Sequence, residues 1–431
     1  MKRLSSLLTA GALCAAALVS PVAGAATLTA QQVAGDTALS TISDLQVTPE
    51  VESQKWYDHY KDDARVLKLQ ATSPAMNGRA IPLAVIPAKN PDRPTVYLLN
   101  GAGSAEQDSD WLYMSDVVDF YAEKDVNVVV PQAGAFSYYT DWLEEPNGKY
   151  LKGPQKWETF LTKELPGPLE ERLNASNKRA IAGMSMSATS SLLLAQHNQG
   201  FYDAAGSFAG CAATAYPTEY EFLRLTVNRG GGQPEQMWGP MGSPYNRYND
   251  ALMNSEKLRG TKLYISSASG FAGEQDTPSY YMNKGYSPLT AYLGSAQLQV
   301  EGGVIEAAVN HCTHMLKAKL DKQNIPATYN FRNVGTHSWP GWRDDLFTSW
   351  ATFERGFNKD AAEGPAAPAV EANELSIEAP QAEENAQVKD APSAADQSPD
   401  KDFVEGKDAE GAAAPNAAEA AAAAEAAVAA E

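Results

Sequence analysis

The sequence lacks a surplus of basic residues, an internal repeat and, beyond its first residues, any apolar run long enough to cross a membrane. It has 34 basic and 53 acidic side chains, and residues 361–431 alone carry 3 basic and 16 acidic residues. The other 360 residues have a net charge of only −6 and no basic face that would neutralise phosphates. We therefore expect no nucleic-acid partner.

The N-terminal residues have the features of a secretory signal. Lys2 and Arg3 precede an apolar run at residues 7–19, and the small residues Ala, Gly and Ala at 23–25 suit a signal peptidase. The run is shorter than the roughly 20 residues that cross a bilayer, although an uncleaved anchor is the alternative. We expect a signal at 1–25 and a secreted mature chain, without a transmembrane span, in the cell envelope or outside the cell.

Two cysteines remain after this signal, Cys211 and Cys312, which lie 101 residues apart. An even number of cysteines in an oxidising compartment favours a disulfide, and two buried free thiols are the alternative. Closing so long a loop contributes about 4 to 5 kcal/mol in the chain-entropy model.

Residues 359–431 differ in composition from the rest of the chain. From residue 361 onward they hold 27 alanines, 16 acidic residues and one aromatic residue, Phe403. Such a segment buries too little apolar surface to offset the entropy of ordering, so we expect a disordered acidic tail. A solvating spacer and a tether to wall polymer or to a partner are both consistent with it.

Residues 26–358 form the predicted catalytic domain, in which short β-rich runs alternate with helical patterns. This alternation predicts an α/β fold with a mostly parallel sheet covered on both faces, and function at the carboxyl ends of its strands. The predicted strands are 65–69, 81–87, 95–99, 126–131, 179–183, 204–208, 262–267 and 328–334. The predicted helices are 113–123, 157–173, 188–197, 305–320 and 344–357.

One strand end carries the clearest chemical signal. The strand at 179–183 leads into Gly-Met-Ser-Met-Ser at residues 183–187, and a helix follows. Small residues two places to either side of a serine permit the strained turn of a nucleophile elbow, here with Ser187 in place of the usual second glycine. We predict Ser185 as the nucleophile and the Met186 amide, at the helix start, as an oxyanion-hole donor.

A serine nucleophile needs a base, and His337 is the candidate because it follows the last predicted strand. His59 precedes the sheet, and His197 lies three turns along the helix after the elbow, about 18 Å from the nucleophile. His311 and His314 have the i, i+3 spacing of a metal pair, but no third ligand accompanies them. No metal site is therefore expected.

The third member of a triad on this fold lies between the serine and the histidine in sequence. Glu306 is our choice, because the helix that it begins would fix it where it orients the imidazole. Glu301 is the main alternative, and Asp276 is a more distant one. A second oxyanion donor is expected from the Ala102 amide, in a glycine-containing turn after strand 95–99, unless this is a simple strand-ending turn.

Several segments occur in the order found in secreted mycolyltransferases. They are Leu-Leu-Asn-Gly at 98–101, Ser-Tyr-Tyr-Thr-Asp-Trp at 137–142, Lys-Trp-Glu-Thr-Phe-Leu-Thr-Lys-Glu-Leu-Pro at 156–166, the elbow, and Gly-Thr-His-Ser-Trp at 335–339. Over residues 67–357 the chain resembles the mycobacterial antigen 85 complex. In its looser spacing and acidic tail it is similar to the corynebacterial relatives of that complex.

This resemblance implies an α/β-hydrolase, without a cofactor, that moves a mycolic acyl chain from trehalose monomycolate to a sugar hydroxyl through a seryl ester. Matched residue by residue, it assigns the nucleophile to Ser185, the base to His337 and the oxyanion donors to Ala102 and Met186. The acid maps to Glu306 after a small shift in spacing. The implied acceptor is a second trehalose monomycolate, the arabinan of cell-wall arabinogalactan under the mycolate layer, or less often a protein serine.

The chain departs from the family pattern at the oxyanion loop, where the mycobacterial enzymes carry Asp-Gly-Leu-Arg. Here the loop begins with Asn100 and has glycine in place of the arginine that helps to hold trehalose. Asn100, Trp339 and Trp342 are candidate substrate contacts; the tryptophans would stack on a sugar or line an acyl groove, unless they are simply packed. Residues 228–249 are expected to form a lid or, equally, a surface loop.

Two other functions are consistent with the same residues. A secreted carboxylesterase would use the same triad and pass the acyl group to water. A cell-wall binding protein would use a disabled hydrolase scaffold without catalysis. The complete set of Ser185, His337 and an acid argues against the binding protein.

Overall fold

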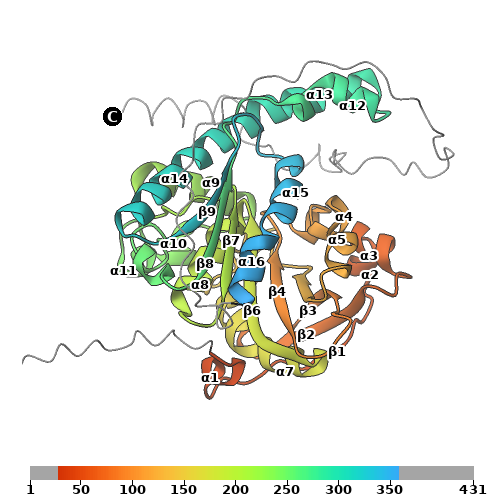
Figure 1. Cartoon of the computed structure of the whole chain (residues 1–431), viewed down its shortest axis with the longest axis vertical. Helices are drawn as coiled ribbons and strands as arrows, with labels where there is room; N and C mark the ends of the chain where they lie inside the picture. The colour runs from red at the N-terminus through yellow and green to blue at the C-terminus, as the bar shows by residue number, and fades with distance from the viewer. Residues whose placement is uncertain (1–27, 359–431) are drawn as a thin grey trace, which may run out of the picture.

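The computed structural model describes residues 28–358, which form one nine-stranded sheet with helices on both faces (Figure 1). The strand order is β1-β2-β3-β5-β4-β6-β7-β8-β9. The six strands from β4 to β9 run parallel, while β1, β2 and β3 pair antiparallel at one side. The predicted α/β-hydrolase architecture is confirmed. The predicted signal at 1–25 and tail at 359–431 lie outside the described residues.

The strands follow the predicted runs, with shifts at their ends. They are β1 Ile42–Asp44, β2 Leu67–Ser73, β3 Arg79–Ile86, β4 Arg93–Leu99, β5 Asn127–Pro131, β6 Ala175–Met184, β7 Ala204–Phe208, β8 Lys262–Ser267 and β9 Ala327–Phe331. β7 and β8 coincide with their predictions, whereas β1 was not predicted because three residues are too few to show an alternating pattern.

The longer helices are α7 Pro166–Leu173, α8 Met186–His197, α9 Pro217–Arg229, α13 Pro288–Gln297, α14 Gly303–Lys322, α15 Trp339–Thr348 and α16 Trp350–Phe357. The shorter ones are α1 Ala30–Ala34, α2 Pro49–Glu52, α3 Lys55–Tyr60, α4 Trp111–Met114, α5 Val117–Ala122, α6 Trp157–Thr159, α10 Pro234–Trp238, α11 Pro244–Tyr248 and α12 Pro278–Asn283. Single turns complete them at η1 Pro74–Met76, η2 Ala105–Gln107, η3 Phe160–Glu164, η4 Ser255–Leu258, η5 Glu274–Asp276 and η6 Leu298–Gly302.

Alternate residues of each strand enter two separate hydrophobic cores, one on each face of the sheet. In β4, Tyr97 and Leu99 join the core that includes residues of α7, α8 and α14. Val96 and Leu98 point to the opposite face, where α3, α4, α5, α15 and α16 supply the partners. This two-residue period is what a strand buried on both faces requires. In Figure 1, α15 and α16 lie on the near side of the sheet.

Three predicted helices differ from the observed ones. The helix expected at 113–123 is divided into α4 and α5, because Ser115 adopts an extended conformation between them. The helix expected at 344–357 starts earlier, at Trp339, and is divided at Ser349 into α15 and α16. The helix expected at 157–173 contains a π turn, η3, which brings Glu164 to the Ser73 hydroxyl and the Ala75 amide.

The segment at 228–249, for which a lid or a surface loop was expected, has helical turns and is anchored in the protein by buried residues. It contains α10 and α11, and both Met237 and Trp238 are completely buried. The Trp238 indole donates a hydrogen bond to the Thr140 hydroxyl at 2.9 Å. Pattern reasoning missed this because the glycines and prolines of the segment suggested a loop.

Within residues 28–358, no helix combines the length and the apolar character that crossing a membrane requires.

Candidate active site

Ser185 lies at the sharp turn between β6 and α8, with φ 55° and ψ −122°. A non-glycine residue in this region stores about 1 to 3 kcal/mol of strain, which the surrounding structure must offset. The Ser185 amide donates to the Phe208 carbonyl at 2.9 Å, which ties the turn to the end of β7. The turn thus projects the serine side chain from the carboxyl edge of the sheet.

The two small residues that flank Ser185 have different tasks. A Cβ on Gly183 would collide with the backbone and hydroxyl of Ser187, so this position requires glycine. The buried Ser187 hydroxyl accepts a hydrogen bond from the Met184 amide at 3.0 Å and lies 3.1 Å from the Leu99 carbonyl at the end of β4. The serine that replaces the usual glycine therefore links the elbow to the neighbouring strand.

His337 lies between Ser185 and Glu306. Its Nε2 is 2.8 Å from Ser185 Oγ, and its Nδ1 is 2.7 Å from Glu306 Oε2. The other Glu306 oxygen accepts the Ala268 amide at 2.6 Å, and the carboxylate is almost completely buried. The structure therefore brings these three predicted residues together, and Glu306 enters from the first turn of α14 as expected.

Neither alternative acid contacts the imidazole. Glu301 is partly exposed and lies 3.3 Å from the Gln297 amide of the preceding turn. The buried Asp276 accepts the Thr336 hydroxyl at 2.7 Å and the Ser338 hydroxyl at 3.4 Å. Asp276 thus holds the residues on both sides of His337, a positioning contact that the sequence did not predict.

The predicted oxyanion donors lie at adjacent strand ends. Ala102 follows β4, and Met186 follows the β6 turn; β4 and β6 are paired up to Leu99 and Gly183. No side chain caps the start of α8. Amides at a helix start favour an anion, so the role of the Met186 amide as an oxyanion donor stays a prediction. The Ala102 carbonyl accepts the Phe136 amide at 2.9 Å, which holds this loop in place.

Asn100 does not have the substrate contact expected of it. The residue is fully buried, its amide nitrogen donates to the Pro131 carbonyl at 2.9 Å, and its oxygen accepts the Trp111 amide at 3.0 Å. These bonds turn the side chain inward, so Asn100 braces the oxyanion loop. The prediction failed because sequence shows the position of an amide in a loop but not its partners.

Trp339 and Trp342 are mostly buried, and little of either ring is exposed for stacking on a sugar. They are only 6% and 8% exposed, and their rings meet edge to face at 5.3 Å. Trp342 also meets the His337 imidazole edge to face at 5.0 Å, and Trp339 meets Trp111 at 5.4 Å. These contacts support the His337 ring, and a direct contact of either tryptophan with substrate stays a prediction.

The other histidines are engaged elsewhere. His197 bonds Glu158 at 3.0 Å and stacks on Tyr248. His314 bonds the Asn310 carbonyl at 2.9 Å, and the exposed His311 lies 3.8 Å from Glu219. Among residues 28–358, no group of three or more histidine, cysteine or acidic side chains has the arrangement of a metal site.

A disulfide joins Cys211 to Cys312, which confirms that prediction. Cys211 follows β7, and Cys312 lies on α14, the helix whose first turn carries Glu306. The bond therefore fixes this helix to the loop beside the elbow.

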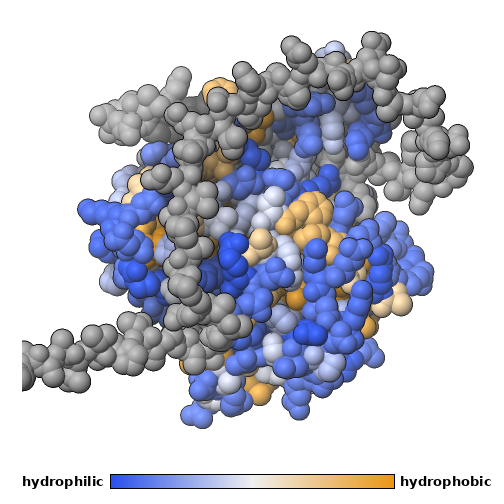
Figure 2. All heavy atoms as spheres, in the orientation of Figure 1, coloured by the Kyte–Doolittle hydropathy of each residue, from blue (hydrophilic) through white to orange (hydrophobic). Residues whose placement is uncertain are grey.

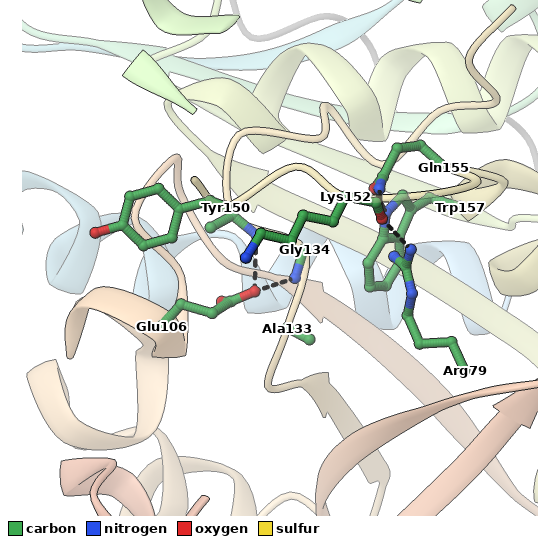
Figure 3. A pocket seen from close by; sticks show the side chains of 9 residues that line it. Arg79, Glu106, Ala133, Gly134, Tyr150, Lys152, Gln155 and Trp157 are labelled. Atoms are coloured by element: carbon green, nitrogen blue, oxygen red, sulfur yellow. Dashed lines mark hydrogen bonds between the residues drawn. The ribbon is translucent and has the colours of Figure 1, made fainter. Parts of the chain in front are cut away.

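A polar cavity of about 240 Å³ lies at the same edge of the sheet, on the β5 side of Ser185. Figure 3 shows Glu106 on one side of it and Arg79 on the other. Glu106 accepts the Gly134 and Ala135 amides at 2.8 and 3.2 Å, and burial raises the pKa of its carboxyl. The cavity is lined by Arg79, Glu106, Ala133, Gly134, Ala135, Tyr150, Lys152, Gln155 and Trp157.

The basic groups of this cavity differ in their freedom. The Arg79 guanidinium donates to the Lys152 and Pro154 carbonyls at 2.5 and 2.9 Å, so its position is fixed. Lys152 is exposed and extends from the opposite loop. The cavity thus combines fixed and adaptable hydrogen-bonding groups. It was not predicted, because its residues come from three segments that sequence spacing does not connect.

A family model and several named relatives match this chain. The family model described as putative esterase matches residues 73–353. The diacylglycerol acyltransferase/mycolyltransferase Ag85A of Mycobacterium tuberculosis (strain H37Rv) is 27% identical over 305 residues, which cover 69% of this chain and 83% of the relative. Ag85B of Mycobacterium leprae is 28% identical over 285 residues, or 64% and 80% of the two chains.

Among solved structures, Mycobacterium tuberculosis MPT51 superposes with a TM-score of 0.55 at 20% identity, covering 68% of this chain and 99% of that one. This likeness shows a shared fold. The family match establishes that the chain belongs to the putative esterase family, as an acyl-transferring or hydrolytic enzyme, and its relatives named above are mycolyltransferases of the antigen 85 type.

Proposed function

We propose that this enzyme transfers a mycolyl chain from trehalose monomycolate to a sugar hydroxyl through an ester on Ser185. The observation that carries the proposal is the continuous hydrogen-bond chain from Ser185 through His337 to Glu306, at 2.8 and 2.7 Å. This arrangement of hydroxyl, imidazole and buried carboxylate activates a serine for acyl transfer. The relatives that share the fold bear the name mycolyltransferase, which supports the choice of acyl group.

In the first half of the reaction, Ser185 Oγ attacks the ester carbonyl carbon while His337 Nε2 takes its proton. Glu306 accepts a hydrogen bond from Nδ1–H of His337 and stabilises the imidazolium that forms. The negative carbonyl oxygen faces the amides of Ala102 and Met186, which favour the tetrahedral intermediate. When the carbon–oxygen bond to trehalose breaks, the departing oxygen takes the proton from His337, and the acyl group stays on Ser185.

In the second half, the acceptor hydroxyl gives its proton to His337 and attacks the seryl ester. The ester bond breaks, and Ser185 recovers its proton from the imidazolium. The acceptor is a second trehalose monomycolate or the arabinan of the wall. Water in its place would produce the free acid, so exclusion of water determines whether transfer or hydrolysis prevails.

The polar cavity is our candidate for the acceptor sugar. It lies after β5, two strands from β6, which places it about 10 Å from Ser185 along the sheet edge. Arg79, Glu106 and Lys152 offer donors and an acceptor to hydroxyl groups, and Tyr150 offers an aromatic surface. This cavity compensates for the arginine that is absent from the oxyanion loop.

The expected location outside the cytoplasm is part of the proposal. The Cys211–Cys312 disulfide supports it, because such bonds persist in oxidising compartments. We propose that residues 1–25 direct secretion and that the enzyme acts at the wall and mycolate layer.

The test is incubation of the purified enzyme with trehalose monomycolate labelled in its acyl chain. Labelled trehalose dimycolate supports the proposal. Labelled free acid with no dimycolate would identify a carboxylesterase, and the absence of both products would identify a binding protein. Adding arabinan or free trehalose as competing acceptors then ranks the acceptors by product.

A further inference from the structure

α13 presents its apolar side chains to solvent and its small ones to the protein. Leu289, Tyr292 and Leu293 are 70%, 60% and 63% exposed, whereas Ala291 and Gly294 on the opposite face are buried. A surface helix ordinarily buries its large apolar face and exposes its polar one. The orientation of α13 is the reverse, so packing among residues 28–358 does not account for its large side chains.

The exposed apolar side chains continue beyond α13. From α13 through η6 into α14, the chain stays helical, and Leu289, Leu293, Val300 and Val304 follow one another at steps of four and seven residues. Val300, Val304 and Ile305 are 51%, 38% and 42% exposed. Within α13 and within the second pair, the step of four residues keeps side chains on one helix face, while the π turn η6 changes the direction of the second pair relative to the first. We call these adjoining groups of exposed apolar side chains the apolar stripe.

The stripe ends at the active site. Val304 and Ile305 directly precede Glu306, the carboxylate bonded to His337. The Gly302 carbonyl accepts the His337 amide at 3.0 Å, which joins the same helix turn to the histidine loop. In Figure 1, α12 and α13 lie beyond the carboxyl edge of the sheet, outside the main body. A group that covers the stripe is therefore adjacent to the acyl-transfer site.

The scarcity of charged residues in the stripe indicates which kind of surface it binds. Residues 287–305 contain one acidic residue, Glu301, and no basic one. A surface that binds anionic lipid headgroups carries lysine and arginine, so the stripe is not suited to them. Most of the face visible in Figure 2 is hydrophilic, and a contiguous exposed apolar surface on such a protein marks an interaction site.

We propose that α13 and the adjoining turns η6 and the start of α14 dock on the alkyl chains of an uncharged lipid layer. The stripe enters the layer and holds the carboxyl edge of the sheet against it, so that an acyl ester reaches Ser185 without crossing water. The polar residues of α12 remain outside. This inference concerns how the protein reaches lipid and does not depend on which acyl group it transfers.

The test measures adsorption of chain 26–431, carrying Ser185→Ala so that no lipid is consumed, to vesicles of pure phosphatidylcholine. The stripe variant carries the three substitutions Leu289→Gln, Tyr292→Gln and Leu293→Gln, because glutamine retains helix propensity. We expect its partitioning into vesicles to fall by about 30-fold or more relative to the parent. The matched control replaces three exposed apolar residues elsewhere, Leu39, Leu143 and Met241, by glutamine and keeps the parent value.

Equal partitioning of the stripe variant and the control variant into vesicles would overturn the proposal. Binding that requires anionic phosphatidylglycerol would also overturn it. A third outcome would show that a second copy covers the stripe instead. In that outcome the parent does not bind vesicles and is dimeric in sedimentation equilibrium, whereas the stripe variant is monomeric. Thermal melting checks that the variants fold. The three replaced side chains are exposed, so their melting temperatures should match the parent.

Discussion

The two sides of the carboxyl edge, with Ser185 between them, have opposite chemistry. On the β5 side, Arg79, Glu106 and Lys152 line a polar cavity. On the β8 side, α13 exposes Leu289 and Tyr292 to solvent. The first side suits hydroxyl groups, and the second suits alkyl chains. An enzyme that joins a lipid acyl group to a sugar needs both surfaces beside one nucleophile, and this difference is why we favour transfer between sugars over simple hydrolysis.

The two sides are also held differently. The cavity wall is tied by bonds to backbone groups, such as those from Glu106 to the Gly134 and Ala135 amides. α13 is attached through small residues and through hydrogen bonds from Ser295 and Gln299 to the Asp276 carbonyl. Few buried apolar contacts imply lower local stability. The polar side is thus the more rigid, and the apolar side is the more adaptable.

The largest expected loss of activity comes from replacing the nucleophile or its base, which lie between the two surfaces. Ser185→Ala and His337→Ala should each lower acyl transfer by about 10⁴-fold or more, because the nucleophile or its base is lost. Single-turnover assays with labelled trehalose monomycolate measure this. His311→Ala, which changes an exposed histidine, should retain full activity. A Ser185→Ala enzyme with substantial activity would mean that another group carries the acyl chain.

Glu306→Ala should be less damaging, with a loss about 100-fold smaller than those of the other two, as for the orienting acid of subtilisin. The imidazole would remain near Ser185 but lose the carboxylate that fixes its orientation. Glu301→Ala, on the same helical segment, is the control and should change the rate little. If Glu301→Ala proved the more damaging, the acid assignment would be wrong.

The disulfide tests how firmly α14 is anchored. Replacing Cys211 and Cys312 together by serine should lower the free energy of unfolding by about 2 to 5 kcal/mol, because the unfolded chain regains the freedom of a long loop. Urea unfolding of the variant, compared with the wild type under oxidising conditions, measures the change. An unchanged midpoint would show that packing alone holds α14.

Lys152→Ala tests whether the polar cavity acts in acceptor binding rather than in formation of the acyl-enzyme. Loss of a charged donor to the acceptor sugar should raise the acceptor KM by about 10-fold while the burst of acyl-enzyme formation is retained. The control is Lys322→Ala, at the far end of α14. An equal loss in the acylation burst would place Lys152 in the donor half of the reaction, and an unchanged acceptor KM would remove the cavity from the account.

A smaller effect is the pH dependence of stability that arises from Asp110, the N-cap of α4. Burial raises the pKa of Asp110 to about 7, although its carboxylate accepts the Leu112 and Tyr113 amides. Because the pKa of Asp110 is higher in the folded protein than in the unfolded chain, the protonated carboxyl favours folding. Its contribution to the free energy of unfolding is therefore fully present at low pH and is lost as the pH rises from about 4 to 7. Asp110→Asn keeps the cap and should abolish about 1 to 4 kcal/mol of this fall.

The measurement is urea unfolding of both proteins across that pH range. Parallel stability curves for wild type and Asp110→Asn would show that the carboxyl does not titrate between pH 4 and 7.

The fold and the triad geometry follow from local patterns, whereas the two flanking surfaces do not. β7 and β8 are short strands that are buried almost throughout, and the Ser185 turn needs small neighbours that are visible in the sequence. The exposure of the apolar side chains of α13 could not be predicted, because an apolar helix face is ordinarily buried. The inward turn of Asn100 depends on Pro131 and Trp111, which only the folded chain brings to it.

The most direct test of the account is to trap the acyl intermediate. The enzyme is mixed with trehalose monomycolate, quenched in acid within the first turnover, digested and examined by mass spectrometry. The account predicts one mycolyl ester, on the peptide that contains Ser185, and its disappearance as dimycolate forms. A mycolyl group on a different residue, or dimycolate that forms without any acylated peptide, would contradict it.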